Sequence, residues 1–170
     1  MTTHQQPSIQ LFVTGGTFDK EYDEIAGRLF FKDSHVSEML KLGRCLLDIQ
    51  VRTLMMVDSL EMTSDDRESI LKQCRTSSSS HIVITHGTDT MSETARVLGE
   101  ASISNKTIVL TGAMVPYKFG SSDGLFNLGA ALAFVQTLPH GVYVVMNGRA
   151  FPWNNVMKNR RTGEFAAKNE

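Results

Sequence analysis

The stretch His81-Ile82-Val83-Ile84-Thr85, followed at once by His86-Gly87-Thr88-Asp89-Thr90, carries the pattern on which the fold depends. Its mostly apolar first half, rich in β-branched side chains, is typical of a short buried strand. The glycine and hydroxyl residues of its second half mark a turn, and a helical pattern follows to about Leu98. This stretch therefore predicts a buried strand, a polar turn and a helix.

The same unit recurs along the chain. Further apolar runs predict strands over Ile9–Val13, Ile49–Val57, Thr107–Thr111 and Gly141–Met146. Between the strands, helical patterns place apolar residues on one face: Val36, Met39, Leu40, Leu46 and Leu47 after a cap at Ser34; Ile70, Leu71 and Cys74 after a capping box of Thr63 and Asp66; and a helix over about 123–138. Residues 18–33 have no clear period and are interpreted as a loop or hairpin.

Alternating short strands and helices predict an α/β fold. The expected architecture is an open, mostly parallel sheet with helices on both faces, Rossmann-like, with right-handed crossovers. A length of 170 residues suits one domain, so we interpret residues 1–170 as a single domain with no second domain. A hydrophobic content of 41% and a net charge of −1 indicate a globular chain and argue against a nucleic-acid partner.

The sequence also bears on the cellular location. Residues 1–8 show neither the basic nor the apolar region of a secretory signal, and no apolar run approaches the roughly 20 residues that span a bilayer, so no membrane partner is expected. The two cysteines, Cys45 and Cys74, are too few for a disulfide framework. We interpret them as reduced packing residues of a cytoplasmic protein, with one disulfide as the minor alternative.

Three of the predicted strands end in threonine and glycine, at Thr14–Thr17, Thr85–Thr90 and Thr111–Gly112. Ligands of open α/β sheets bind at the carboxyl ends of the strands. Glycine allows the backbone to approach a ligand, and a threonine hydroxyl becomes a nucleophile when a base activates it. Threonine and glycine are also common in purely structural turns, so from any one turn both interpretations stay open.

Several kinds of site lack their motifs. Neither G-x-G-x-x-G nor G-x-x-x-x-G-K-[ST] occurs, so no nucleotide cofactor is expected. No zinc-type spacing joins the histidines and no C-x-x-C is present, so no metal is expected either. The histidines are His4, His35, His81, His86 and His140. His86, at a strand end, is either a base or a residue that hydrogen-bonds its turn, and we favour the second.

Thr14-Gly15-Gly16-Thr17, combined with His86-Gly87-Thr88-Asp89-Thr90-Met91, resembles the bacterial-type L-asparaginase family. The resemblance runs in order from about Ile9 to Lys158. Its further matching segments are Asp58–Thr63, Gly112–Pro116, Ser122–Leu128, Val144–Asn147 and Lys158 itself. One T-G-G-T is a weak signal, whereas both motifs with a correctly spaced lysine are a specific one.

The resemblance implies roles for individual residues. Thr17 is then the nucleophile that attacks the side-chain amide and forms an acyl-enzyme. Thr88, Asp89 and Lys158 form a second hydroxyl–carboxylate–amine group. Substrate-binding positions are Gly16, Ser59, Thr88 and Asp89, with backbone N–H groups near Thr17 and Thr88 stabilising the oxyanion.

Two of these roles have structural alternatives. The family places a tyrosine on a mobile loop that covers the site; Tyr22 lies on that loop but close to Thr17, and a packing role is given equal weight. Lys158 belongs to a basic run with Arg160 and Arg161, which by itself would indicate a solvated surface. Whether Lys158 acts as a neutral base stays open, because a nearby aspartate favours the ammonium.

The resemblance implies hydrolysis of L-asparagine, with L-glutamine less favoured, and no cofactor. The family usually carries a second, C-terminal domain that completes the site across a subunit interface. Because Asn159–Glu170 is polar and shows no interrupted apolar run, we favour a compact single-domain member over a fragment, and expect a homo-oligomer, a dimer or tetramer. The alternatives are a catalytically weak amino-acid-binding domain or a subunit of a larger amidase or amidotransferase assembly.

Overall fold

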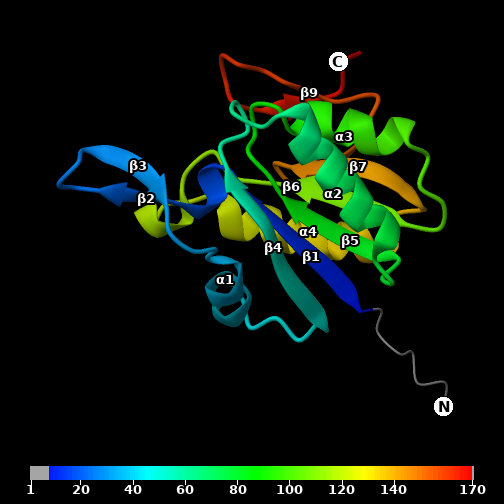
Figure 1. Cartoon of the computed structure of the whole chain (residues 1–170), viewed down its shortest axis with the longest axis horizontal. Helices are drawn as coiled ribbons and strands as arrows, with labels where there is room; N and C mark the ends of the chain where they lie inside the picture. Colours follow the sequence, from blue (N-terminus) through cyan, green and yellow to red (C-terminus); the bar gives the residue numbers. More distant parts are fainter. Residues whose placement is uncertain (1–7, 170) are drawn as a thin grey trace.

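The computed structural model describes residues 8–169 and is built on a six-stranded sheet (Figure 1). The strand order is β4-β1-β5-β6-β7-β8, formed by Ile49–Val57, Ile9–Gly15, His81–Thr85, Thr107–Thr111, Gly141–Met146 and Arg149–Pro152. The first five strands are parallel, and each contains one of the predicted runs. The sixth, β8, was not predicted and pairs antiparallel with β7.

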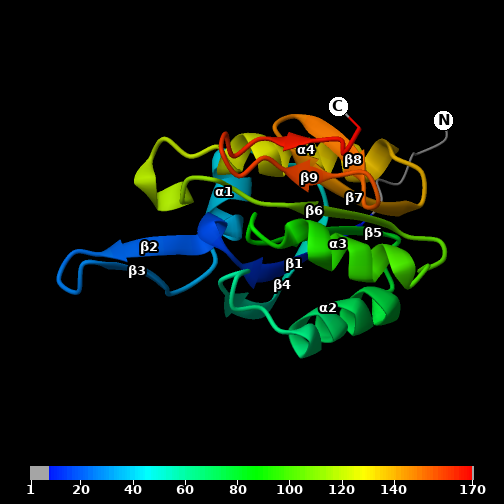
Figure 2. The same cartoon turned by 90° about the horizontal axis from the view of Figure 1, so that it is seen from above.

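Helices cover both faces of the sheet. They are α1 (Val36–Leu42), α2 (Ser64–Thr76), α3 (Met91–Glu100) and α4 (Gly124–Thr137). Alternate residues of the strands pack against α2 and α3 on one face and against α1 and α4 on the other (Figure 2). The predicted α/β class, with an open and mostly parallel sheet between two helical layers, is confirmed.

The crossovers do not all have the predicted hand. The steps β4 to β5, β5 to β6 and β6 to β7 all run in the same direction across the sheet. However, α2 and α3 lie on one face while α4 lies on the other. The β6–α4–β7 crossover therefore has the opposite hand to the two before it and is an exception to the rule that such crossovers are almost always right-handed. Strand and helix patterns specify which residues are buried, but not which face a helix covers.

The first helix is shorter than its apolar pattern predicted. It ends at Leu42, where the N–H of Gly43 bonds the carbonyls of Met39 and Lys41. Leu46 lies beyond the helix with 93% of its surface exposed, so it does not share the buried face of Met39. The predicted capping box of α2 does form: the Thr63 hydroxyl accepts from the Asp66 N–H at 3.2 Å, and the Asp66 carboxylate accepts from the Thr63 N–H at 2.8 Å.

Two hairpins complete the structure. Residues 18–33 include β2 (Lys20–Asp23) and β3 (Arg28–Phe31), an antiparallel pair that projects beyond the sheet (Figure 1). At the other end of the chain, β9 (Met157–Lys158) pairs with β10 (Phe165–Ala166). The interpretation of this tail as polar is incomplete, because Phe165 is only 3% exposed and belongs to the core cluster that also contains residues of α2 and α3.

The cysteine prediction is confirmed, because Cys45 and Cys74 are both free. Burial raises the pKa of the Cys74 thiol to about 12, which keeps it protonated and unreactive. Residues 1–7 and 170 lie outside the described part, and with them His4 and nearly all of the N-terminal segment that we interpreted as lacking a secretory signal. No helix within residues 8–169 has the length and apolar character to cross a bilayer.

We expect Phe165 to anchor the hairpin that carries Lys158. Phe165→Ala removes a buried ring and should lower the free energy of unfolding by about 3–5 kcal/mol, because a cavity remains where the ring packed. Met157→Ala is the matched control on the same hairpin, since Met157 is 47% exposed and should cost less than about 1 kcal/mol. Urea unfolding measures both values. Equal losses in the two variants would contradict the anchoring role.

Candidate active site

Most of the predicted site residues lie in the turns where the parallel strands end or, like Lys158, contact those turns. The turns after β4, β1 and β5 lie next to one another, because these strands are neighbours in the sheet. The chain leaves β1 toward β4 on one side and later returns to β5 on the other, so the strand order reverses at β1. Open α/β sheets bind ligands at such a reversal point. The fold thus directs attention to the β1 and β5 turns.

Three turns approach one another with no room for a side chain. A Cβ atom added to Gly16 would lie 2.3 Å from the backbone nitrogen of Gly87. One added to Gly87 would lie 2.5 Å from both Cβ and Oγ of Ser59. Gly16 also has a positive φ of 77°, which favours glycine. Gly16 is therefore held directly against Gly87, and Gly87 against Ser59.

Thr17 begins a single 3₁₀ turn, Thr17–Asp19, immediately after Gly16. Its side chain is half-buried, whereas the next residue, Phe18, is fully buried and fixes the turn in the core. The Asp19 carboxylate accepts the backbone N–H of His35 at 2.7 Å. Burial raises the pKa of Asp19, against the opposing effect of that hydrogen bond. These contacts hold Thr17 at the carboxyl edge of the sheet, where the sequence predicted it.

Lys158 contacts the two residues that the family resemblance groups with it. Its Nζ atom lies 2.8 Å from the Thr88 hydroxyl and 2.8 Å from Oδ1 of Asp89. The lysine side chain is 12% exposed and the aspartate 41%, so the ion pair lies at the mouth of the site with its cation on the inner side. An amine, a hydroxyl and a carboxylate separated by some 70 residues of sequence thus form one group.

Ser59 is buried beside this group. Its carbonyl accepts a hydrogen bond from the Thr90 hydroxyl at 2.8 Å. The preceding residue, Asp58, forms an ion pair with Lys20 at the base of the β2–β3 hairpin. Partial burial acts to raise the pKa of Asp58, but the hydrogen bonds from Lys20 and from the Leu60 N–H outweigh it and hold the pKa below its ordinary value. The hairpin is therefore tied to the Ser59 turn.

Tyr22 is placed on that hairpin but not in the polar group. It lies on β2 opposite Leu29, and 54% of its surface is exposed. Within residues 8–169 its hydroxyl forms no hydrogen bond. Much of the Tyr22 side chain thus faces solvent instead of packing in the core, and its covering role at the site stays a prediction.

His86 has the structural role that we favoured over a base. Its ring is completely buried: Nδ1 donates to the Gly87 carbonyl at 2.8 Å, and Nε2 lies 2.7 Å from the Thr94 hydroxyl, which donates to it. Burial lowers the pKa of His86 to about 4, and the positive charge of Arg67 adds to this effect. A neutral, enclosed imidazole with both nitrogens engaged holds the turn of Gly87 and has no path to a substrate proton.

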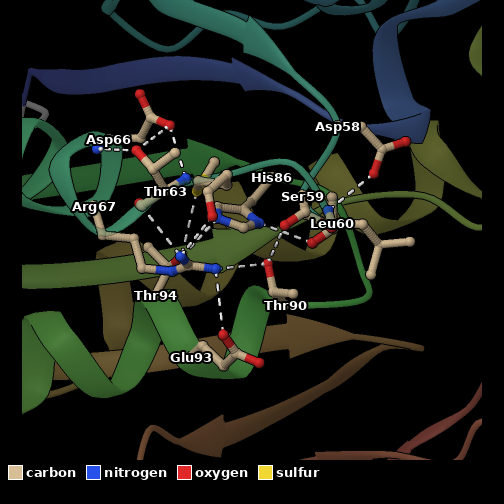
Figure 3. A network of polar contacts seen from close by, with 12 residues as sticks. Asp58, Ser59, Leu60, Thr63, Asp66, Arg67, His86, Thr90, Glu93 and Thr94 are labelled. Carbon is tan, nitrogen blue, oxygen red and sulfur yellow. Dashed lines mark hydrogen bonds and ion pairs between the residues drawn. The ribbon is translucent and has the colours of Figure 1, made fainter.

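Sequence analysis missed three residues that shape the site. Met114 lies with its sulfur 3.5 Å from the Thr88 hydroxyl, and the Asp123 carboxylate accepts the Met114 N–H at 3.0 Å. Arg67 donates to the Thr90 hydroxyl at 3.0 Å (Figure 3). The sequence did contain a sign that Arg67 is unusual. Arg67 lies three residues before Ile70 and four before Leu71, so a charged side chain falls on the apolar, buried face of α2.

A polar pocket of about 420 Å³ opens beside the lysine group. Asp89, Met114 and Lys158 form its inner wall, and its outer wall is residues 160–163, which include two arginines. A second depression, of about 430 Å³ between α1 and α4, is lined mainly by leucines and lies away from the chemistry. Within residues 8–169 no three His, Cys, Asp or Glu side chains are grouped as a metal site would need.

Comparisons with known proteins agree on one family. A family model described as "Asparaginase, N-terminal" matches residues 8–169. "Probable L-asparaginase periplasmic" of Haemophilus influenzae is 31% identical over 177 residues, covering 92% of this chain and 47% of that protein. "L-asparaginase 1" of Escherichia coli is 30% identical over 177 residues, covering 97% and 52%. This chain therefore spans about half the length of these curated relatives.

The solved structures show the same relation. A crystal structure described as the probable cytoplasmic L-asparaginase from Campylobacter jejuni has a TM-score of 0.83 and 29% sequence identity to this chain. It covers 95% of this chain, whereas this chain covers 53% of it. The likeness thus extends over almost all of this chain and about half of the solved one.

The buried His86 predicts acid sensitivity of the fold. The unfolded chain binds a proton at this histidine near its ordinary pKa of 6.5, while the folded protein binds it only near 4. The stability contributed by the neutral ring is therefore complete above pH 6.5 and is lost as the pH falls. Between pH 7 and 5 we expect His86 to account for a loss of about 2 kcal/mol.

Urea unfolding at pH 7, 6 and 5 measures this effect. His86→Gln should have lower stability at pH 7 but a flatter dependence on pH. His140→Gln, a change at an exposed histidine, serves as the control and should keep the slope of the unchanged protein. An equal slope in His86→Gln would contradict the assignment.

Proposed function

This chain belongs to the asparaginase family, and from that membership and the geometry of the site we propose that it is an amidohydrolase that converts L-asparagine to L-aspartate and ammonia. The observation that carries the proposal is the position of Lys158, whose amine lies 2.8 Å from both Thr88 and Asp89. A lysine that served only to form an ion pair with Asp89 would not also need the Thr88 hydroxyl as a partner. A group that polarises a threonine hydroxyl beside a second threonine suits acyl transfer.

Thr17 is the proposed nucleophile. Its oxygen forms a bond to the side-chain amide carbon, and the carbon–nitrogen bond then breaks. The proton of the Thr17 hydroxyl leaves with the nitrogen as ammonia, and an ester between Thr17 and aspartate remains. Water then attacks that ester, which releases L-aspartate and restores the hydroxyl. Each half needs a group that accepts a proton from the attacking oxygen and returns it.

The Thr88–Lys158 pair supplies the electrostatic part of this step. The Lys158 ammonium forms an ion pair with the Asp89 carboxylate at 2.8 Å. The lysine ammonium donates to the Thr88 oxygen and polarises that hydroxyl, in a site shielded from bulk water on the Lys158 side. Thr88 in turn lies next to Gly87, whose backbone touches the turn of Thr17. Lys158 therefore acts on the reacting atoms through Thr88.

The remaining groups bind the amino-acid end of the substrate. Lys158 engages Oδ1 of Asp89, which leaves Oδ2 as the acceptor for the substrate ammonium. Ser59, packed against Gly87, offers its hydroxyl and its turn to the substrate carboxylate. One methylene separates L-asparagine from L-glutamine and is worth about 1–3 kcal/mol of discrimination.

We also propose a homo-oligomer in the cytoplasm. The support for an oligomer is the exposed position of the site, whose Asp89 and residues 160–162 lie at the surface, where a neighbouring copy can exclude water. The support for the cytoplasm is the pair of free cysteines, which suits a reducing compartment. Sedimentation at assay concentration should give a dimer or tetramer. A monomer with full activity would refute the oligomer proposal.

Ammonia release from L-asparagine and L-glutamine tests the catalytic proposal. Thr17→Ala should lose at least about a thousandfold in kcat with an unchanged melting temperature, because it removes the nucleophile but no buried packing. Lys158→Met should lose about a hundredfold or more, because the charge beside Thr88 is gone. Lys168→Met, a change at an exposed lysine, is the control and should keep the wild-type rate.

Two results would contradict the proposal. A fully active Lys158→Met variant would remove Lys158 from the mechanism. A well-folded wild-type protein that releases no ammonia from either amino acid would favour the binding-domain or assembly-subunit alternative. A rise in melting temperature with added L-aspartate would then support binding without catalysis.

A further inference from the structure

Arg67 is a charged residue on the buried face of α2, outside the proposed catalytic group. Its side chain is 11% exposed, and its ion-pair partner, Glu93 of α3, is 55% exposed. A buried guanidinium is costly unless hydrogen bonds satisfy it. Arg67 lies on the same buried face of α2 as the apolar residues Ile70 and Leu71. Its hydrogen-bond partners therefore indicate which structural role the buried charge has.

The guanidinium holds two different segments at once. Nη1 donates to the carbonyls of Met62 at 2.9 Å and Thr63 at 3.3 Å, at the far end of the turn that starts with Ser59. Nη2 donates to the Thr90 hydroxyl at 3.0 Å and to Glu93 at 3.3 Å, at the start of α3. Figure 3 shows the guanidinium between these two segments.

The Thr90 hydroxyl connects Arg67 to Ser59 through two hydrogen bonds. Arginine only donates hydrogen bonds, so the Thr90 oxygen accepts from Arg67 and its own proton is free to point elsewhere. That proton is donated to the Ser59 carbonyl at 2.8 Å. The result is a directed chain from Arg67 through Thr90 to Ser59, in which each hydrogen bond polarises the next.

We infer that Arg67 is a positioning residue that sets the distance between the Ser59 turn and the Thr88-Asp89 turn, and so determines how tightly the amino-acid end of the substrate is bound. The inference rests on the proposed function for its substrate, L-asparagine. Arg67 does not touch the reacting atoms. Lysine cannot replace it, because one ammonium lacks the planar fork that reaches both segments.

Kinetics of L-asparagine hydrolysis test this role. Arg67→Met and Thr90→Val should each raise KM about tenfold and change kcat less than threefold, because binding geometry is disturbed while Thr17 and Lys158 keep their places. The inhibition constant of L-aspartate should rise by the same factor. Arg67→Lys should fall between Arg67→Met and the wild type, and Thr90→Ser should restore most of what Thr90→Val loses. Arg75→Met, at an exposed arginine of the same helix, is the matched control.

A double variant separates the directed chain from two independent effects. If Arg67 acts through Thr90, Arg67→Met with Thr90→Val should raise KM no further than the stronger single change. Increases that multiply would overturn the inference, as would a folded Arg67→Met variant with the KM of the Arg75→Met control. If Arg67→Met fails to fold, Arg67→Lys takes its place in the same cycle.

Hydrogen exchange of backbone amides tests the positioning role of Arg67 even if the protein does not hydrolyse L-asparagine. The amides of Glu61 and Met62 bond the carbonyls of Asp58 and Ser59 within the turn. In Arg67→Met these amides should exchange at least tenfold faster than in Arg75→Met. A wild-type protein without turnover would contradict the proposed function, but the hydrogen-exchange measurement would still test the role of Arg67. Unchanged exchange at Glu61 and Met62 would overturn the positioning role.

Discussion

The contact of Gly16 with Gly87, and of Gly87 with Ser59, is the constraint on which the site depends. Each of these glycines lies so near the next turn that a Cβ atom would stand within 2.5 Å of it. The turns after β4, β1 and β5 therefore meet backbone to backbone, at the point where the strand order reverses. Ser59 is itself one of the contacting residues, and Thr17 and Thr88 directly follow Gly16 and Gly87. The contacts of the glycines therefore bring these three hydroxyl residues to one place.

The reversed crossover around α4 supports the same edge from the other side. Because α4 covers the face of α1, Asn127 reaches the ends of β6 and β7, donating to the Gly112 carbonyl at 2.9 Å and accepting from the Asn147 N–H at 3.2 Å. Asp123, at the start of α4, holds the Met114 segment beside Thr88. The unusual hand thus places polar groups of α4 where they order the loops around the lysine group.

Buried polar groups fix the turns that the glycines bring together. His86 holds the Gly87 carbonyl, and Arg67 holds the turn after Ser59. Both lie on the face of α2 and α3, and the charge of Arg67 helps to keep His86 neutral. A buried donor or acceptor costs free energy unless it is paired, so such groups persist where they order a particular backbone geometry. Here that geometry carries the proposed substrate-binding residues.

The five parallel strands, the capping box of α2 and the grouping of Lys158 with Thr88 and Asp89 could all be predicted from the amino-acid sequence. These follow from local periodicity, from side chains that cap their own helix, and from family motifs in register. The packing of the folded chain added three features that no sequence pattern showed: α4 crosses to the face of α1, Phe165 lies in the core, and Arg67 pairs with Thr90. Each of these depends on which distant segment packs against a given residue, and the local pattern of apolar and polar side chains carries no record of that partner.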